Sequence, residues 1–111
     1  MWLFTEGGFV SVIRHQSEAG KLIVRARDYK SLEGIANVIG LDIEPSPGRD
    51  YPYRVFIDDS IFAAWLSKQV MNINYSNYKD HMETIRDHDF SCALHGVWSA
   101  MQQAEDGEAR M

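Results

Sequence analysis

Two short runs rich in β-branched residues, near the start of the chain, restrict its fold most strongly. Residues 9–14 (FVSVIR) and 22–27 (LIVRAR) have the composition of strands, and a short polar stretch that contains a glycine separates them. Adjacent strands joined by so short a connection pair antiparallel, as a hairpin. Before them, Gly7 and Gly8 predict a tight bend after an aromatic start. The chain therefore opens with an antiparallel sheet.

Apolar residues recur at helical spacing in three later stretches. The first predicts a helix over 32–39 that ends at Gly40, with Asp28 or Ser31 as its cap. The second helix begins at 58–60, where two aspartates and a serine can cap it. Its inner stripe comprises Phe62, Trp65, Leu66, Gln69, Val70 and Ile73. The last helix has the clearest stripe, formed by Phe90, Ala93, Leu94, Val97, Trp98 and Met101.

Between the first two helices, alternation of apolar residues predicts a strand over 53–58. Residues 41–43 could begin another strand, and the Pro- and Gly-containing segment 44–50 is expected to be a loop. The order ββαβ(β)αα predicts the α+β class. We expect an antiparallel sheet of three to four strands with helices on one face, ferredoxin-like or a related two-layer sandwich. One domain over 1–103 and a polar, disordered tail over 104–111 complete this prediction.

Composition restricts the environment and the partners of the protein. Of 111 residues, 45% are hydrophobic, yet no apolar run reaches membrane-spanning length and no leader pattern opens the chain. A single cysteine, Cys92, cannot form an internal disulfide, so we expect a cytoplasmic protein. The net charge of −5 argues against nucleic acid as a direct ligand and is compatible with a protein partner. A homodimer is compatible with the sequence as well.

Arginines mark the first candidate surface. Arg25 and Arg27 alternate with apolar residues, so both project from the same side of a strand, and Arg54 could join them from a neighbouring strand. Such a basic spot suits a carboxylate, a phosphate or an acidic helix. The alternative is ion pairing across the sheet with one of three acidic residues, Asp28, Asp58 or Glu44.

The second candidate surface is the polar and aromatic segment 73–79. Its exposed residues would be Tyr75, Asn77, Tyr78 and Lys79, types that form adaptable contact surfaces. Alternatively, both tyrosines fold back and close the core beside the last helix.

The third candidate is one face of the last helix. His88, Cys92 and His95 recur at i, i+4 and i+7, and their imidazole and thiolate groups could bind a metal such as Zn²⁺. The alternative is a polar outer face, because three ligands on one straight helix rarely converge. Cys92 could also be a nucleophile paired with a histidine, although a cysteine in mid-helix is badly placed for attack.

Neighbouring carboxylates occur twice, as Asp58 with Asp59 and as Asp87 with Asp89. Each pair could share Mg²⁺ or act in acid–base catalysis, but both stand at helix starts, where capping explains them more simply. No nucleotide-binding or hydrolase motif occurs. We therefore expect no cofactor and no catalytic residue.

Several short motifs occur together in the chain: VRAR over 24–27, YPYR over 51–54, INYSNYK over 73–79 and the Trp-Leu-Phe start. In combination they resemble a group of short bacterial and phage proteins that have no established activity. This resemblance implies an accessory protein rather than a particular mechanism.

The leading hypothesis is a non-enzymatic protein-interaction module, a phage or mobile-element accessory protein that inhibits or modulates a larger host nucleic-acid or defence complex, like an anti-CRISPR protein. Its expected interface residues are Arg25, Arg27, Arg54, Tyr75, Asn77, Tyr78 and Lys79. One alternative is a metal-binding or small-ligand enzyme that uses His88, Cys92 and His95. The other is a nucleic-acid binder that uses the arginine strand.

Overall fold

The computed structural model describes residues 1–109 and has an α+β architecture, with a five-stranded antiparallel sheet and four helices in that part of the chain. The chain divides into two compact units, Met1–Ile73 and Asn74–Met111, which are described separately below. The element order βββαββααα has five strands where three to four were predicted and four helices where three were predicted, and it is not clearly ferredoxin-like.

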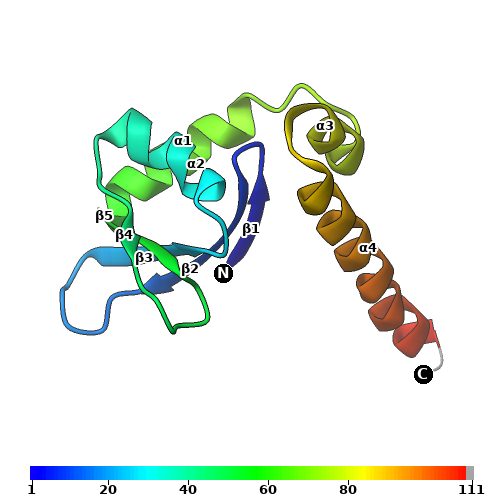
Figure 1. Ribbon diagram of the computed structural model, residues 1–111, viewed down its shortest axis with the longest axis horizontal. Helices are drawn as coiled ribbons and strands as arrows, with labels where there is room; N and C mark the ends of the chain where they lie inside the picture. The colour runs from blue at the N-terminus through cyan, green and yellow to red at the C-terminus, as the bar shows by residue number, and fades with distance from the viewer. Residues whose placement is uncertain (110–111) are drawn as a thin grey trace. The chain divides into compact units, whose positions relative to one another are not determined.

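The first unit holds the whole sheet and two helices (Figure 1). Its elements are β1 (Trp2–Thr5), β2 (Gly8–Arg14), β3 (Lys21–Ala26), α1 (Lys30–Ile39), β4 (Glu44–Pro45), β5 (Tyr53–Asp58) and α2 (Asp59–Met71). The strands lie in the order β1-β2-β3-β5-β4, and every neighbouring pair is antiparallel. The predicted hairpin and the strand over 53–58 are confirmed.

The core of this unit lies between one face of the sheet and both helices, which occupy the same side of the sheet in Figure 1. Alternate strand residues, among them Val24 and Val55, point into this core and are fully buried. From the helices, Leu32 and Phe62 pack against them. Because side chains alternate along a strand, the residues between these core positions lie on the opposite face.

Strand β1 was not predicted. Its residues pair with β2 from Trp2, opposite Ser11, to Thr5, opposite Gly8. The expected bend at the glycines is the turn that joins these two strands. Gly8 has φ 135°, a conformation that side-chain-bearing residues rarely adopt.

The predicted position of the next short strand was wrong. Strand β4 is Glu44–Pro45, within the segment expected to be a loop, rather than 41–43. It lies at the edge of the sheet, where Pro45 is tolerated because the missing N–H removes no bond to a second neighbour.

Helix α1 agrees with its predicted range and ends at Gly40, which has φ 78°. Its predicted cap is wrong, because Tyr29 stands at the N-cap and no side chain makes a cap hydrogen bond. Instead, the Ser31 hydroxyl donates to Asp28 and accepts from the Phe9 backbone amide at 3.2 Å. Ser31 therefore joins the helix to β2.

Helix α2 ends at Met71, as the turn-forming asparagine after it predicted. Its apolar stripe is buried only at the beginning. Phe62 is buried, whereas Val70 and Ile73 are 57% and 52% exposed. The sheet is thus covered by the first turns of this helix.

The second unit consists of α3 (Tyr78–Ile85), which was not predicted, and α4 (His88–Ala109), and the two helices contact each other. The Asn77 side chain caps α3 by accepting from the Asp80 backbone amide at 2.9 Å. Helix α4 includes residues 104–109, part of the segment expected to be a disordered tail. Residues 110–111 lie outside the described residues.

Within the apolar stripe of α4, burial does not extend beyond Leu94. Leu94 is 7% exposed, but Val97, Trp98 and Met101 are 41%, 56% and 63% exposed. Among the described residues, no helix combines the length and apolar character needed to cross a membrane.

Burial in the core of the first unit leads to a stability prediction. Leu32 is fully buried there. We expect Leu32→Ala to lower the free energy of unfolding by about 2–5 kcal/mol, since it removes apolar contacts and leaves a cavity. Val38 lies on the same helix and is 74% exposed, so Val38→Ala should change the stability by less than about 0.5 kcal/mol. Urea unfolding followed by circular dichroism measures both. Equal losses in the two variants would contradict the assigned core.

Candidate binding face

The sheet face opposite α1 and α2 carries a row of side chains that crosses all five strands. Register aligns Trp2 with Ser11, Ser11 with Arg25, Arg25 with Arg54, and Arg54 with Glu44. Each of these residues alternates with core positions, so all five belong to the same face. We call this surface the arginine face.

Within the arginine face, Tyr51 holds two of the predicted arginines together. The guanidinium carbons of Arg25 and Arg27 lie 4.6 Å and 4.9 Å from the centre of its ring. Arg25 also donates to the Ser11 hydroxyl at 2.7 Å, and Arg27 donates to the Asp50 carbonyl at 3.0 Å. Because Tyr51 is only 7% exposed, these cation–π contacts fix the guanidinium groups against an enclosed ring. We call Arg25, Arg27 and Arg54 the arginine cluster.

The third arginine, Arg54, lies directly opposite Arg25 on the neighbouring strand. Burial, together with the positive charges of Arg49 and Arg25, lowers the pKa of Arg54. Like charges directly opposite one another destabilise a sheet. The Nε atoms of Arg25 and Arg54 are also buried without a hydrogen-bond partner among the described residues. Two arginines are therefore held together at a cost.

The acidic residues that could have neutralised the arginines do not do so. Asp58 pairs with Lys21 at 2.6 Å, and Asp28 accepts from Ser31. Glu44 stands opposite Arg54 in register, but in the part of the chain that the structure describes no ion pair joins them. Among the described residues, neither Asp58 nor Glu44 forms the ion pair with the arginine cluster that the alternative explanation requires.

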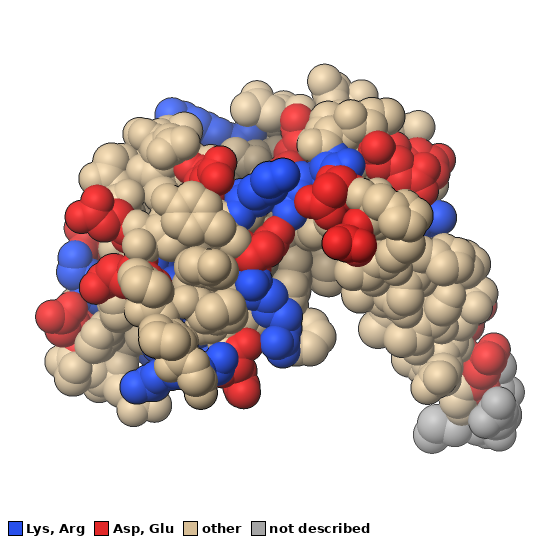
Figure 2. All heavy atoms as spheres, viewed as in Figure 1, with Lys and Arg blue, Asp and Glu red and all other residues tan. Residues whose placement is uncertain are grey.

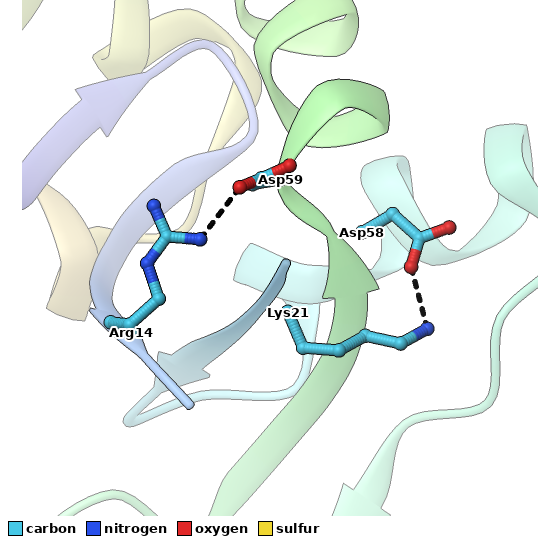
Figure 3. A network of polar contacts seen from close by, with 4 residues as sticks. All are labelled: Arg14, Lys21, Asp58 and Asp59. Carbon is cyan, nitrogen blue, oxygen red and sulfur yellow. Dashed lines mark hydrogen bonds and ion pairs between the residues drawn. The ribbon is translucent and has the colours of Figure 1, made fainter. Parts of the chain in front are cut away.

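The carboxylates of Asp58 and Asp59 bind two different cations (Figure 3). Asp59 accepts from Arg14 at 2.6 Å, whereas Asp58 faces Lys21. Asp58 occupies the N-cap of α2 without a side-chain cap bond, so the expected capping by this residue is wrong. The two carboxylates do not share a site. Asp87, by contrast, does cap α4, accepting from the Phe90 amide at 2.8 Å.

An aromatic cluster lies at the β1 and β2 end of the arginine face. The Phe9 ring stacks on Phe4 at 4.7 Å and meets the Trp2 ring edge-on at 5.7 Å. Trp2 is 70% exposed, so a large apolar surface stands in the same cross-strand row as the arginines. The sequence patterns did not predict Trp2, Ser11 or Tyr51 as site residues. The period-2 pattern of β2 could have indicated Ser11, and the YPYR motif could have indicated Tyr51.

The residues predicted on segment 73–79 have local roles within the second unit. Asn77 caps α3, and the Tyr75 ring stacks on His81 at 4.7 Å. Burial raises the pKa of Tyr78. Lys79 lies 6.0 Å from the Trp98 ring centre. These contacts favour the alternative in which the tyrosines pack, and a contact role for this segment stays a prediction.

On α4, the predicted metal ligands come together only in part. The Cys92 sulfur lies 3.3 Å from His88 Nε2, whereas the His95 ring stacks on Trp98 at 5.9 Å. Residues seven apart on a helix are separated by about 10 Å along its axis, which is too far for one ion. In the described part of the chain, no three His, Cys, Asp or Glu side chains are placed to hold a metal. A shallow pocket does lie here, lined by Glu83, Arg86, His88, Ser91, Cys92 and His95.

Comparisons of the chain with protein-family models, with curated proteins and with solved structures found no match. The candidate site therefore depends on the contacts described above.

The Arg14–Asp59 bond leads to a prediction about pH. The hydrogen bond from Arg14 lowers the pKa of Asp59, so this bond contributes stability above the ordinary carboxyl pKa, and the contribution is lost as pH falls through the lowered value. We expect Arg14→Gln to raise the Asp59 pKa towards its ordinary value of about 3.9, as measured by NMR titration of the side-chain carboxyl. Lys68→Gln is the control and should leave the Asp59 titration unchanged. An unaltered midpoint in Arg14→Gln would contradict the bond.

Proposed function

We propose that this protein is a non-enzymatic interaction module that binds an acidic segment of a larger protein through its arginine face. The observation that carries the proposal is the pair Arg25 and Arg54, two cations opposite each other with no carboxylate bound to either among the described residues. A carboxylate from a partner would supply the missing charge. Arginine binds carboxylates in a bidentate, charge-assisted geometry, which is stronger than a neutral hydrogen bond.

The character of the site favours a protein over a nucleic acid. The arginine cluster has only three side chains, a small basic surface for a long polyanion that is bound through many phosphates. The acidic Glu44 also closes one end of the row, next to Arg54. Such a module acts by occupying a surface of a larger complex, as expected of a phage accessory protein that inhibits a host nucleic-acid or defence assembly.

A second candidate function, binding of single-stranded nucleic acid, is favoured by one observation. Trp2 is largely exposed in the same row as the arginines, and exposed aromatic rings beside arginines stack on bases.

Titration with defined anions tests the proposed function. We expect a glutamate-rich peptide to shift the NMR signals of Ser11, Arg25 and Arg54, because these residues lie at the binding face. Arg54→Gln should weaken the binding by about tenfold or more, since a hydrogen bond to a charged group contributes about 1.5–3 kcal/mol. Arg54→Lys should weaken it less than Arg54→Gln, because the charge remains while the bidentate geometry is lost.

Matched controls make this titration specific. Lys68, on α2 in the helix layer, has the same charge, so Lys68→Gln should bind the peptide like the unchanged chain. An oligothymidylate of equal charge and inorganic phosphate serve as competing probes. If Lys68→Gln loses as much affinity as Arg54→Gln, the binding is non-specific and the proposal is wrong. Tighter binding of the oligonucleotide than of the peptide would favour the second candidate instead.

A further inference from the structure

The apolar stripe of α4 lacks a cover over most of its length. Leu94 is buried, but Val97, Trp98 and Met101, which follow at helical spacing, are each more than 40% exposed. Figure 2 shows uncharged surface along the middle of α4 on the side in view. A helix in water normally buries such a stripe against another element. The exposed part of this stripe is therefore a candidate docking surface.

The stripe continues in acidic residues. Glu105 and Glu108 follow Met101 at i+4 and i+7, so both lie on the same side of α4 as Trp98. Both are exposed, and acidic side chains gather near the described end of this helix in Figure 2. One helix face thus presents an aromatic and aliphatic half followed by a carboxylate half.

The arginine face has the complementary pattern in the same order. Its row begins at Trp2, beside the aromatic cluster, and reaches Arg25 two strands away and Arg54 three strands away. At strand spacings of about 4.8 Å these arginines lie about 10 Å and 14 Å from Trp2.

The acidic residues of α4 are spaced to match this row. At a rise of about 1.5 Å per residue, Glu105 and Glu108 lie about 10 Å and 15 Å from Trp98 along the helix axis. A helix laid along the row would place Trp98 over Trp2 and both carboxylates over the arginines.

We propose that the α4 stripe of one copy of this chain docks on the arginine face of a second copy. Val97, Trp98 and Met101 cover the aromatic end of the face, and Glu105 and Glu108 bind Arg25 and Arg54. The inference rests on the proposed function, because it uses the same arginines, and it names the acidic segment that reaches them. It also explains in one contact both the exposed helix stripe and the unneutralised arginine pair.

Charge exchange between two variants tests this contact. We expect the unchanged chain to associate as its concentration rises in sedimentation-velocity experiments, and to dissociate at high salt because the contact is partly ionic. The variants E105K/E108K and R25E/R54E should each associate at least tenfold more weakly. An equimolar mixture of the two should associate again, because each altered surface then meets its charge complement. Circular dichroism shows whether both variants are folded.

A matched variant controls for net charge. Asp106 adjoins Glu105 but lies on a different side of the helix, so D106K should associate like the unchanged chain, whereas E105K should not. A chain that stays monomeric at every concentration overturns the inference. So does association that neither charge-reversed variant weakens, or a mixture that does not recover. In each of these cases a glutamate-rich peptide that still binds the arginine face leaves the proposed function standing.

Discussion

Antiparallel pairing between β3 and β5 determines which residues of this protein face its core and which form its candidate site. The register places Val24 opposite Val55 and Arg25 opposite Arg54. Because side chains alternate along strands, a slip of one residue would bury the arginines and expose the valines. The apolar core therefore fixes the register, and the register in turn brings two cations together. The favourable free energy of burying the core offsets the unfavourable free energy of holding the two arginines together.

The separation of charge along the chain explains how a basic site exists on an acidic protein. Residues 1–73 contain eight Lys and Arg against nine Asp and Glu, whereas residues 74–111 contain three against seven. The unit that holds the sheet is nearly neutral, so the field near Arg25 and Arg54 is set by local arginines rather than by the total charge. Within this unit, Asp58 and Asp59 are bound to Lys21 and Arg14 instead. The net charge of the chain therefore does not indicate the local basic site at Arg25 and Arg54.

Sequence patterns predicted the elements whose local propensity agrees with their burial. The hairpin, the helix ending at Gly40 and the strand over 53–58 are of this kind. Strand β1 escaped prediction because four residues beginning at Trp2 are too few to show alternation, and only pairing with β2 defines them. For the site, alternation could place Arg25 and Arg27 on one side of a strand. It could not show that Tyr51, from a loop, would lie against both, because that contact is tertiary.

The stripe on α4 shows where periodicity reaches its limit as a guide to structure. Spacing alone indicates that Val97, Trp98 and Met101 share one side of a helix, and this is correct. It does not indicate what covers that side, because an intramolecular core and an intermolecular contact impose the same pattern. Beyond Met101 the stripe continues into Glu105 and Glu108. A helix face buried in its own core would not place carboxylates at the next helical positions, since burying a charge without a partner is costly. The pattern of the whole stripe, apolar and then acidic, is complementary to the aromatic and basic row of the arginine face.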